Sequence, residues 1–117
     1  MKLEADKYTV EYTRKTRTIT FKGVLRLQNK EEYRNISELL SQAASETTGL
    51  PLILDMHNLV FLNSSGISSL SMFILKMRKL GKEIHIQGNS SIPWQTKSLK
   101  NFQKLYSKVD ITFLSDS

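Results

Sequence analysis

The stretch that decides the predicted fold is LILDMHNLVFLNSSGISSLSMFILKMRKLGKEIHI, residues 52–86. Its first three residues, 52–54, are apolar, and a run of this length is typical of a buried strand and too short for a helix. Asp55 interrupts the run, and residues 57–62 are expected to form a loop. The stretch therefore begins with a short strand and leads into a polar turn, Asn63-Ser64-Ser65-Gly66.

A helix is expected after this turn because the apolar residues now recur at helical spacing. Its apolar arc consists of Ile67, Leu70, Phe73, Ile74, Met77 and Leu80. Gly81 is placed to end the helix, and residues 84–86 predict the next strand. Strand, turn, helix and strand within about 35 residues form a βαβ unit, and open α/β sheets usually place function at the carboxyl end of the first strand.

The residues before this unit predict a hairpin and a helix. Segments 8–13 and 18–22 alternate and are rich in β-branched and aromatic side chains, and residues 24–27 predict a short continuation. Asn29 is expected to cap the helix, with Glu32 three residues further on as in a capping box. The apolar residues of this helix are Ile36, Leu39, Leu40, Ala43 and Ala44.

The residues after the unit predict a last helix that begins at Pro93, the position where proline fits best. Its apolar stripe consists of Leu99, Phe102, Leu105 and Tyr106. Residues 109–113 are compatible with a short strand or with a simple anchor, and residues 115–117 are expected to fray.

Length and composition limit the possible classes of protein. A chain of 117 residues with 39% hydrophobic residues is expected to form one domain, residues 1–117. It has no cysteine, no apolar run long enough for a membrane span and no signal-peptide pattern at its start, so a cytoplasmic location is expected. The net charge of +6 favours acidic partners without choosing among them.

The central unit also resembles a known family. An apolar strand ending in Asp55, the pair Phe61-Leu62, the turn Asn63-Ser64-Ser65-Gly66 and an apolar helix are similar to the STAS domain of bacterial anti-sigma factor antagonists and sulfate transporter tails. The family usually has Asp where this chain has Asn63. The resemblance covers most of the chain. The expected fold is therefore a single α/β STAS-like domain, with a small mixed sheet of four to five strands and helices packed mainly on one face.

The resemblance implies a non-enzymatic signalling module. Its partner would be a regulatory protein such as an anti-sigma factor with serine kinase activity, which would phosphorylate Ser64, and a phosphatase would restore binding. Asn63 removes a carboxylate beside this serine. That change either eases phosphorylation, because repulsion is removed, or deprives a kinase of a group that it recognises.

The expected partner-binding residues lie in the turn and on the helix face opposite the apolar arc. Met72 and Leu75 are apolar residues on this outer side, which favours either a binding surface or a cover by another element. The full set is Asn63, Ser65, Gly66, Ser68, Met72, Leu75 and Lys79. Helix capping by Asn63, Ser64 or Ser65 is the competing explanation for the polar turn.

Catalysis and cofactor binding find little support. The serine nucleophile motif needs glycine two residues before the serine, where Ser64 has Leu62. The histidines, His57 and His85, are isolated, and no metal ligand set, catalytic residue or cofactor is expected. The alternative function is a charge-driven adaptor that binds nucleic acid or anionic lipid through Lys97, Lys100, Lys104 and Lys108. No aromatic residues are interleaved with these lysines, so a nucleic-acid partner is not expected.

Overall fold

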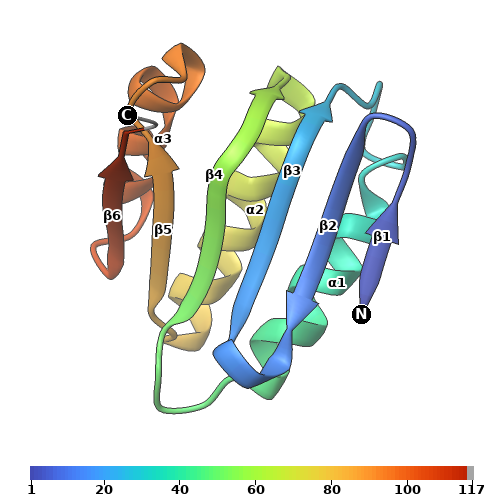
Figure 1. The fold of residues 1–117 in the computed structure, drawn as a ribbon. Helices are drawn as coiled ribbons and strands as arrows, with labels where there is room; N and C mark the ends of the chain where they lie inside the picture. Colours follow the sequence, from blue (N-terminus) through green and yellow to red (C-terminus); the bar gives the residue numbers. More distant parts are fainter. Residues whose placement is uncertain (116–117) are drawn as a thin grey trace.

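A mixed six-stranded sheet with three helices on one face forms the molecule (Figure 1). The computed structural model describes residues 1–115, and the strands lie side by side in chain order. The strands are β1 (Lys2–Glu4), β2 (Tyr8–Thr13), β3 (Thr18–Leu25), β4 (Leu52–Leu62), β5 (Ile84–Asn89) and β6 (Val109–Leu114). The helices are α1 (Arg34–Glu46), α2 (Ser64–Leu80) and α3 (Pro93–Leu105). The predicted fold class is confirmed, with one more strand than expected.

The layered arrangement follows from the connections. The first three strands pair antiparallel, and β3–β4, β4–β5 and β5–β6 pair parallel, each through one helix. Crossovers between parallel strands are nearly always right-handed, so a sheet that grows in one direction receives every crossover helix on the same face. The other face is open and carries a row of polar side chains in register, Thr20, Asp55, Gln87 and Thr112.

The core lies between the sheet and the helices. On α2, the predicted apolar arc is buried at Leu70, Phe73, Ile74 and Met77 and partly buried at Ile67. The prediction was wrong for Leu80, which is 54% exposed. Leu80 is the last residue of α2, and Gly81 ends the helix as predicted, in a left-handed conformation with φ of 70°. The arc therefore ends one turn before the helix does.

Strand β4 is much longer than predicted. The expectation that Asp55 ends the strand and that residues 57–62 form a loop was wrong, because β4 continues to Leu62 beside β3. Register shifts opposite Lys22 and Val24 add extra β4 residues, as β-bulges do. The Asp55 carboxylate accepts a hydrogen bond from the backbone N–H of His57, at 3.1 Å.

The edge of β4 beyond Asp55 is covered by side chains, because β5 pairs only with the first four residues of β4. The amide nitrogen of the fully buried Gln95 donates to the carbonyl oxygens of Met56 and Leu59, at 2.6 and 3.0 Å. Trp94 donates to the same Leu59 oxygen at 3.0 Å, and Asn89 donates to His57 O at 3.1 Å. The last residue of β5 and the start of α3 thus complete the hydrogen bonding that a neighbouring strand would supply.

Helix α1 begins later than its predicted cap. The Asn29 side chain accepts from the Glu32 N–H at 3.1 Å, and the Glu32 carboxylate accepts from the Gln28 N–H. These bonds close a turn that leads into the helix, which begins at Arg34. The prediction that the helix starts directly after Asn29 was therefore wrong, and only the Asn29 half of the capping box forms, because Glu32 accepts from Gln28 and not from Asn29.

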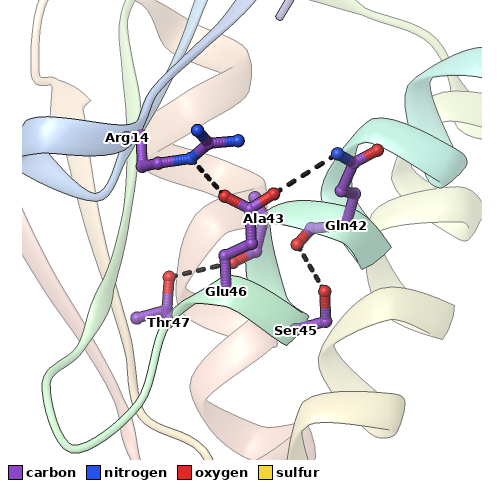
Figure 2. A network of polar contacts seen from close by, with 6 residues as sticks. All are labelled: Arg14, Gln42, Ala43, Ser45, Glu46 and Thr47. Carbon is purple, nitrogen blue, oxygen red and sulfur yellow. Dashed lines mark hydrogen bonds and ion pairs between the residues drawn. The ribbon is translucent and has the colours of Figure 1, made fainter.

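The far end of α1 is fixed to the hairpin turn. Figure 2 shows the Arg14 guanidinium against the Glu46 carboxylate, which also accepts from the Gln42 amide at 3.3 Å. The Thr47 hydroxyl donates to Ala43 O at 2.9 Å and closes the last turn. The bond from Arg14, followed by that from Gln42, lowers the pKa of Glu46. This contact contributes stability above the ordinary carboxyl pKa and loses it as the pH falls through the lowered value.

The carboxyl-terminal part follows the prediction in most respects. Pro93 occupies the first turn of α3, and residues 109–114 form β6, so the alternative of a simple anchor is excluded. Lys108 lies beyond α3, which ends at Leu105, so the predicted lysine stripe does not continue to Lys108 on the helix. The sequence predicted fraying over residues 115–117. Residues 116 and 117 of this segment lie outside the described part of the chain. Within residues 1–115, no helix is long and apolar enough to cross a membrane.

Candidate functional site

Asn63 shapes the turn between β4 and α2. Its backbone is extended, with φ of −79° and ψ of 176°, and its side-chain oxygen accepts from the Gly66 N–H at 3.0 Å. Its own carbonyl oxygen accepts from the Ile67 N–H at 2.9 Å. Of the three residues that the sequence offered as caps, Asn63 is the one that performs this role.

The Asn63 side chain also ties α2 to two other elements. Its oxygen accepts from the Tyr33 hydroxyl at 2.6 Å, just before α1, and its nitrogen donates to Leu27 O at 2.6 Å, just after β3. The backbone N–H of Asn63 donates to Leu25 O at 3.1 Å. An aspartate has no nitrogen to donate to Leu27. The contact with Leu27 O is therefore a local physical reason for asparagine where the resembling family has aspartate.

Tyr33 and Gly66 pack against this polar contact. Burial raises the pKa of Tyr33, whose hydroxyl donates to the Asn63 side chain. Gly66 is buried, and a Cβ added there would lie 2.2 Å from Leu62 Cδ1 and 2.7 Å from the Tyr33 hydroxyl. Among the predicted partner-binding residues, Gly66 therefore presents no side chain to the surface, and its role is to permit this close approach.

The two serines of the turn differ in exposure. Ser64, the first residue of α2, is exposed, and the described residues include no hydrogen-bond partner for its hydroxyl. Ser65 is partly buried, and its hydroxyl donates to Gln28 O at 3.4 Å. Capping is already performed by Asn63, so the capping explanation does not account for Ser64.

A groove of about 540 Å³ opens beside this turn, between α1 and α2. Three predicted partner-binding residues lie in its wall, namely Ser65, Ser68 and Met72. Phe73 lies beside Met72 in the wall, and Met72 is 60% exposed, so no other element covers it. Leu75 and Lys79 are exposed on α2 but do not line the groove.

Sequence reasoning missed the other wall of the groove. Ser37 and Ser41 contribute from α1, and Lys30, Ser69 and Lys76 complete the lining. The spacing of Ser37 and Ser41 places them on one helix face. The sequence around these serines gives no sign that this face lies beside α2. The two helices become neighbours only because both pack on the same face of the sheet.

The remaining predicted charges and ligands lie apart from this groove. Lys97, Lys100, Lys104 and Lys108 are all exposed at the other end of the sheet, on α3 or just after it. Within the described part of the chain, no cluster of three or more His, Cys, Asp or Glu residues is placed to hold a metal ion.

The fold and the turn define a small α/β domain in which a capped polar turn joins a parallel strand to a helix whose outer face is exposed. Neither a family model nor a curated protein matches the sequence. Among solved structures, SiaC of Pseudomonas aeruginosa matches with a TM-score of 0.74 at 12% identity, over 98% of this chain and 97% of that one. Apo-SiaC of the same organism matches at 0.67 and 15% identity, over 100% and 99%.

A third match comes from the complex of the diguanylate cyclase SiaD with its activator SiaC from Pseudomonas aeruginosa. Its TM-score is 0.75 at 11% identity, over 98% of each chain. At these identities, the likeness establishes a shared fold over nearly the whole chain.

Proposed function

We propose that this chain is a non-enzymatic, STAS-like regulator that binds a regulatory protein along α2 and is switched by phosphorylation at Ser64. The observation that carries the proposal is the exposed Ser64 at the start of a helix whose outer face also exposes Met72 and Leu75. The shared fold supports it, because SiaC is described as the activator of a cyclase in a complex.

The chemistry of the turn suits a phosphate. The first N–H groups of a helix point outward and carry the positive end of its dipole, so a phosphoserine is tolerated there. The phosphate adds nearly two negative charges to a surface on which Asn63 is neutral. A partner that docks over this surface loses affinity when the charge appears.

The partner classes follow from the resemblance and from the comparison. The first candidate is an anti-sigma factor with serine kinase activity, whose effect a phosphatase reverses. With this partner, the module acts in the cytoplasm. A diguanylate cyclase is the second candidate, by analogy with the SiaC complex. Both predict a protein interface at α2.

Ser64→Asp is expected to weaken partner binding about tenfold, which corresponds to about 1.4 kcal/mol. The introduced carboxylate supplies part of the charge of a phosphate at the same place. Ser64→Ala should bind as the parent does in the unphosphorylated state and remain bound when the kinase is active. Isothermal titration with the partner purified from the source cell measures both variants.

Intact-mass analysis of the native protein, under conditions that activate and silence the pathway, supplies the independent readout. Absence of phosphate on Ser64 under both conditions, together with parent-like binding by Ser64→Asp, would make Ser64 a surface residue without a regulatory role.

Replacing Met72 and Leu75 together with serine should change the free energy of unfolding by less than about 0.5 kcal/mol, because both side chains face solvent. Partner binding should fall by at least about tenfold, because the apolar contact is lost. Thermal melting and titration measure the two effects separately. Replacement of Lys97 and Lys100 by serine on α3 is the matched control and should leave both values unchanged. A large fall in melting temperature would assign the pair to the core instead.

A further inference from the structure

The groove between α1 and α2 combines an apolar surface with positive charge. The exposed Met72 supplies most of the apolar part, the buried Phe73 lies beside it, and serine hydroxyls line the rest. Lys30 and Lys76 are the charged residues of its lining, which contains no carboxylate. Among the described residues, neither lysine has a salt-bridge partner. The groove therefore presents two uncompensated cations beside an apolar surface.

The two lysines lie at opposite ends of the groove. Lys30 lies two residues after Gln28, whose carbonyl oxygen accepts from Ser65 at the start of α2. The Lys76 ammonium donates to the Ser41 hydroxyl at 3.1 Å, further along both helices. Ser65 and Lys76 are separated by about 16 Å along α2, at a rise of about 1.5 Å per residue.

We propose that this groove receives a short amphipathic helix of the partner protein with an apolar centre and an acidic residue toward each end. Its apolar side chains pack on the exposed Met72, beside the buried Phe73, and its carboxylates reach Lys30 and Lys76. Grooves between helices commonly bind an amphipathic helix in this way. The volume of the groove between α1 and α2 is in the usual range for binding sites. In a helix that lies along the groove, the acidic residues are about 11 positions apart.

This inference rests on the proposed function and specifies the charge of the partner. A phosphate on Ser64 lies at the Lys30 end of the groove. It repels an acidic segment and attracts a basic one, so only an acidic partner is released by phosphorylation. The net charge of +6 also favours an acidic partner, because it attracts that partner during association.

The test is a displayed library of helical peptides about 20 residues long, which span about 30 Å, selected on the purified protein. Selected peptides should carry central apolar residues on one face, with Asp or Glu about 11 positions apart. Lys30→Glu/Lys76→Glu should weaken a selected peptide at least about tenfold and favour basic peptides in a repeated selection. Ser68→Trp, which fills the groove from an exposed position, should abolish binding without lowering the melting temperature.

The matched control is Lys97→Glu/Lys100→Glu, which reverses the same number of charges on α3. It should bind the selected peptides as the parent does. Peptides that are basic or uncharged, or that bind Ser68→Trp equally well, would overturn the inference. So would anionic phosphatidylglycerol vesicles or RNA that compete with the peptides for Lys30 and Lys76.

The two proposals fail separately. If the peptides do not use the groove while Ser64→Asp still weakens the native partner, the groove inference is wrong and the proposed function stands. If the peptides use the groove but the native partner is indifferent to Ser64→Asp, the regulatory role of Ser64 is wrong.

Discussion

Asn63→Asp is expected to lower the free energy of unfolding by about 2 to 3 kcal/mol. The new carboxylate can still accept from the Gly66 N–H and from the Tyr33 hydroxyl, but Leu27 O loses its donor. At the present distance of 2.6 Å, an oxygen would face that carbonyl oxygen in place of a nitrogen. Chemical denaturation followed by circular dichroism measures the loss.

Ser64→Asp is the matched control for this substitution, because it places the same carboxylate one residue further on, at an exposed site. Its stability should be unchanged or slightly higher, since negative charge is favoured at a helix start. If Asn63→Asp were as stable as the control, water or a shifted backbone would have to satisfy Leu27 O. The contact with Leu27 would then not explain the departure from the family pattern.

Gln95→Leu is expected to have the larger effect, a loss of about 3 to 5 kcal/mol. The substitution keeps much of the volume of a fully buried side chain but removes its hydrogen bonds. Met56 O and Asn89 N–H, which bond to Gln95 at 2.6 and 2.7 Å, lose this partner. Leu59 O retains the bond from Trp94.

Trp94 is the single tryptophan of the chain, so its fluorescence reports on this corner of the molecule during urea unfolding. Gln103→Leu, on the exposed side of the same helix, is the matched control and should cost no more than about 1 kcal/mol. Equal effects of the two variants would mean that water replaces Gln95 at the edge of β4.

The helices and the order of the elements were predictable from the sequence because their signals are local. Periodic apolar residues showed α2 and α3, and Gly81 and Pro93 marked a helix end and a helix start. The helical wheel also placed Met72 and Leu75 on the solvent side. Strand β1 was missed because three residues, Lys2–Glu4, carry too little alternation to detect.

The extension of β4 was not predictable because its partners are remote in sequence. The groups that bond to Met56, His57 and Leu59 come from Asn89, Trp94 and Gln95, between 32 and 39 residues away. Polar residues such as Asp55 interrupt the apolar run because one sheet face is open, and bulges shift the alternation.

The candidate site was predictable only on its α2 side. Ser64, Ser68 and Met72 follow from the turn and the helix, whereas Ser37 and Ser41 reach the groove through the packing of α1 beside α2. The role of Gly66 likewise depends on Tyr33, which lies 33 residues earlier in the chain. A glycine in a first helical turn gives no local sign of such a contact.

The agreement between strand order and chain order has a consequence for synthesis on the ribosome. Each strand joins the sheet at the edge left by the strand before it, so no strand has to be inserted between two strands that are already paired. Loop closure for every parallel pair spans only one helix and its connections, which keeps the entropic cost of each step small. The sheet can therefore grow in the direction of translation, with β6 as the last strand to join.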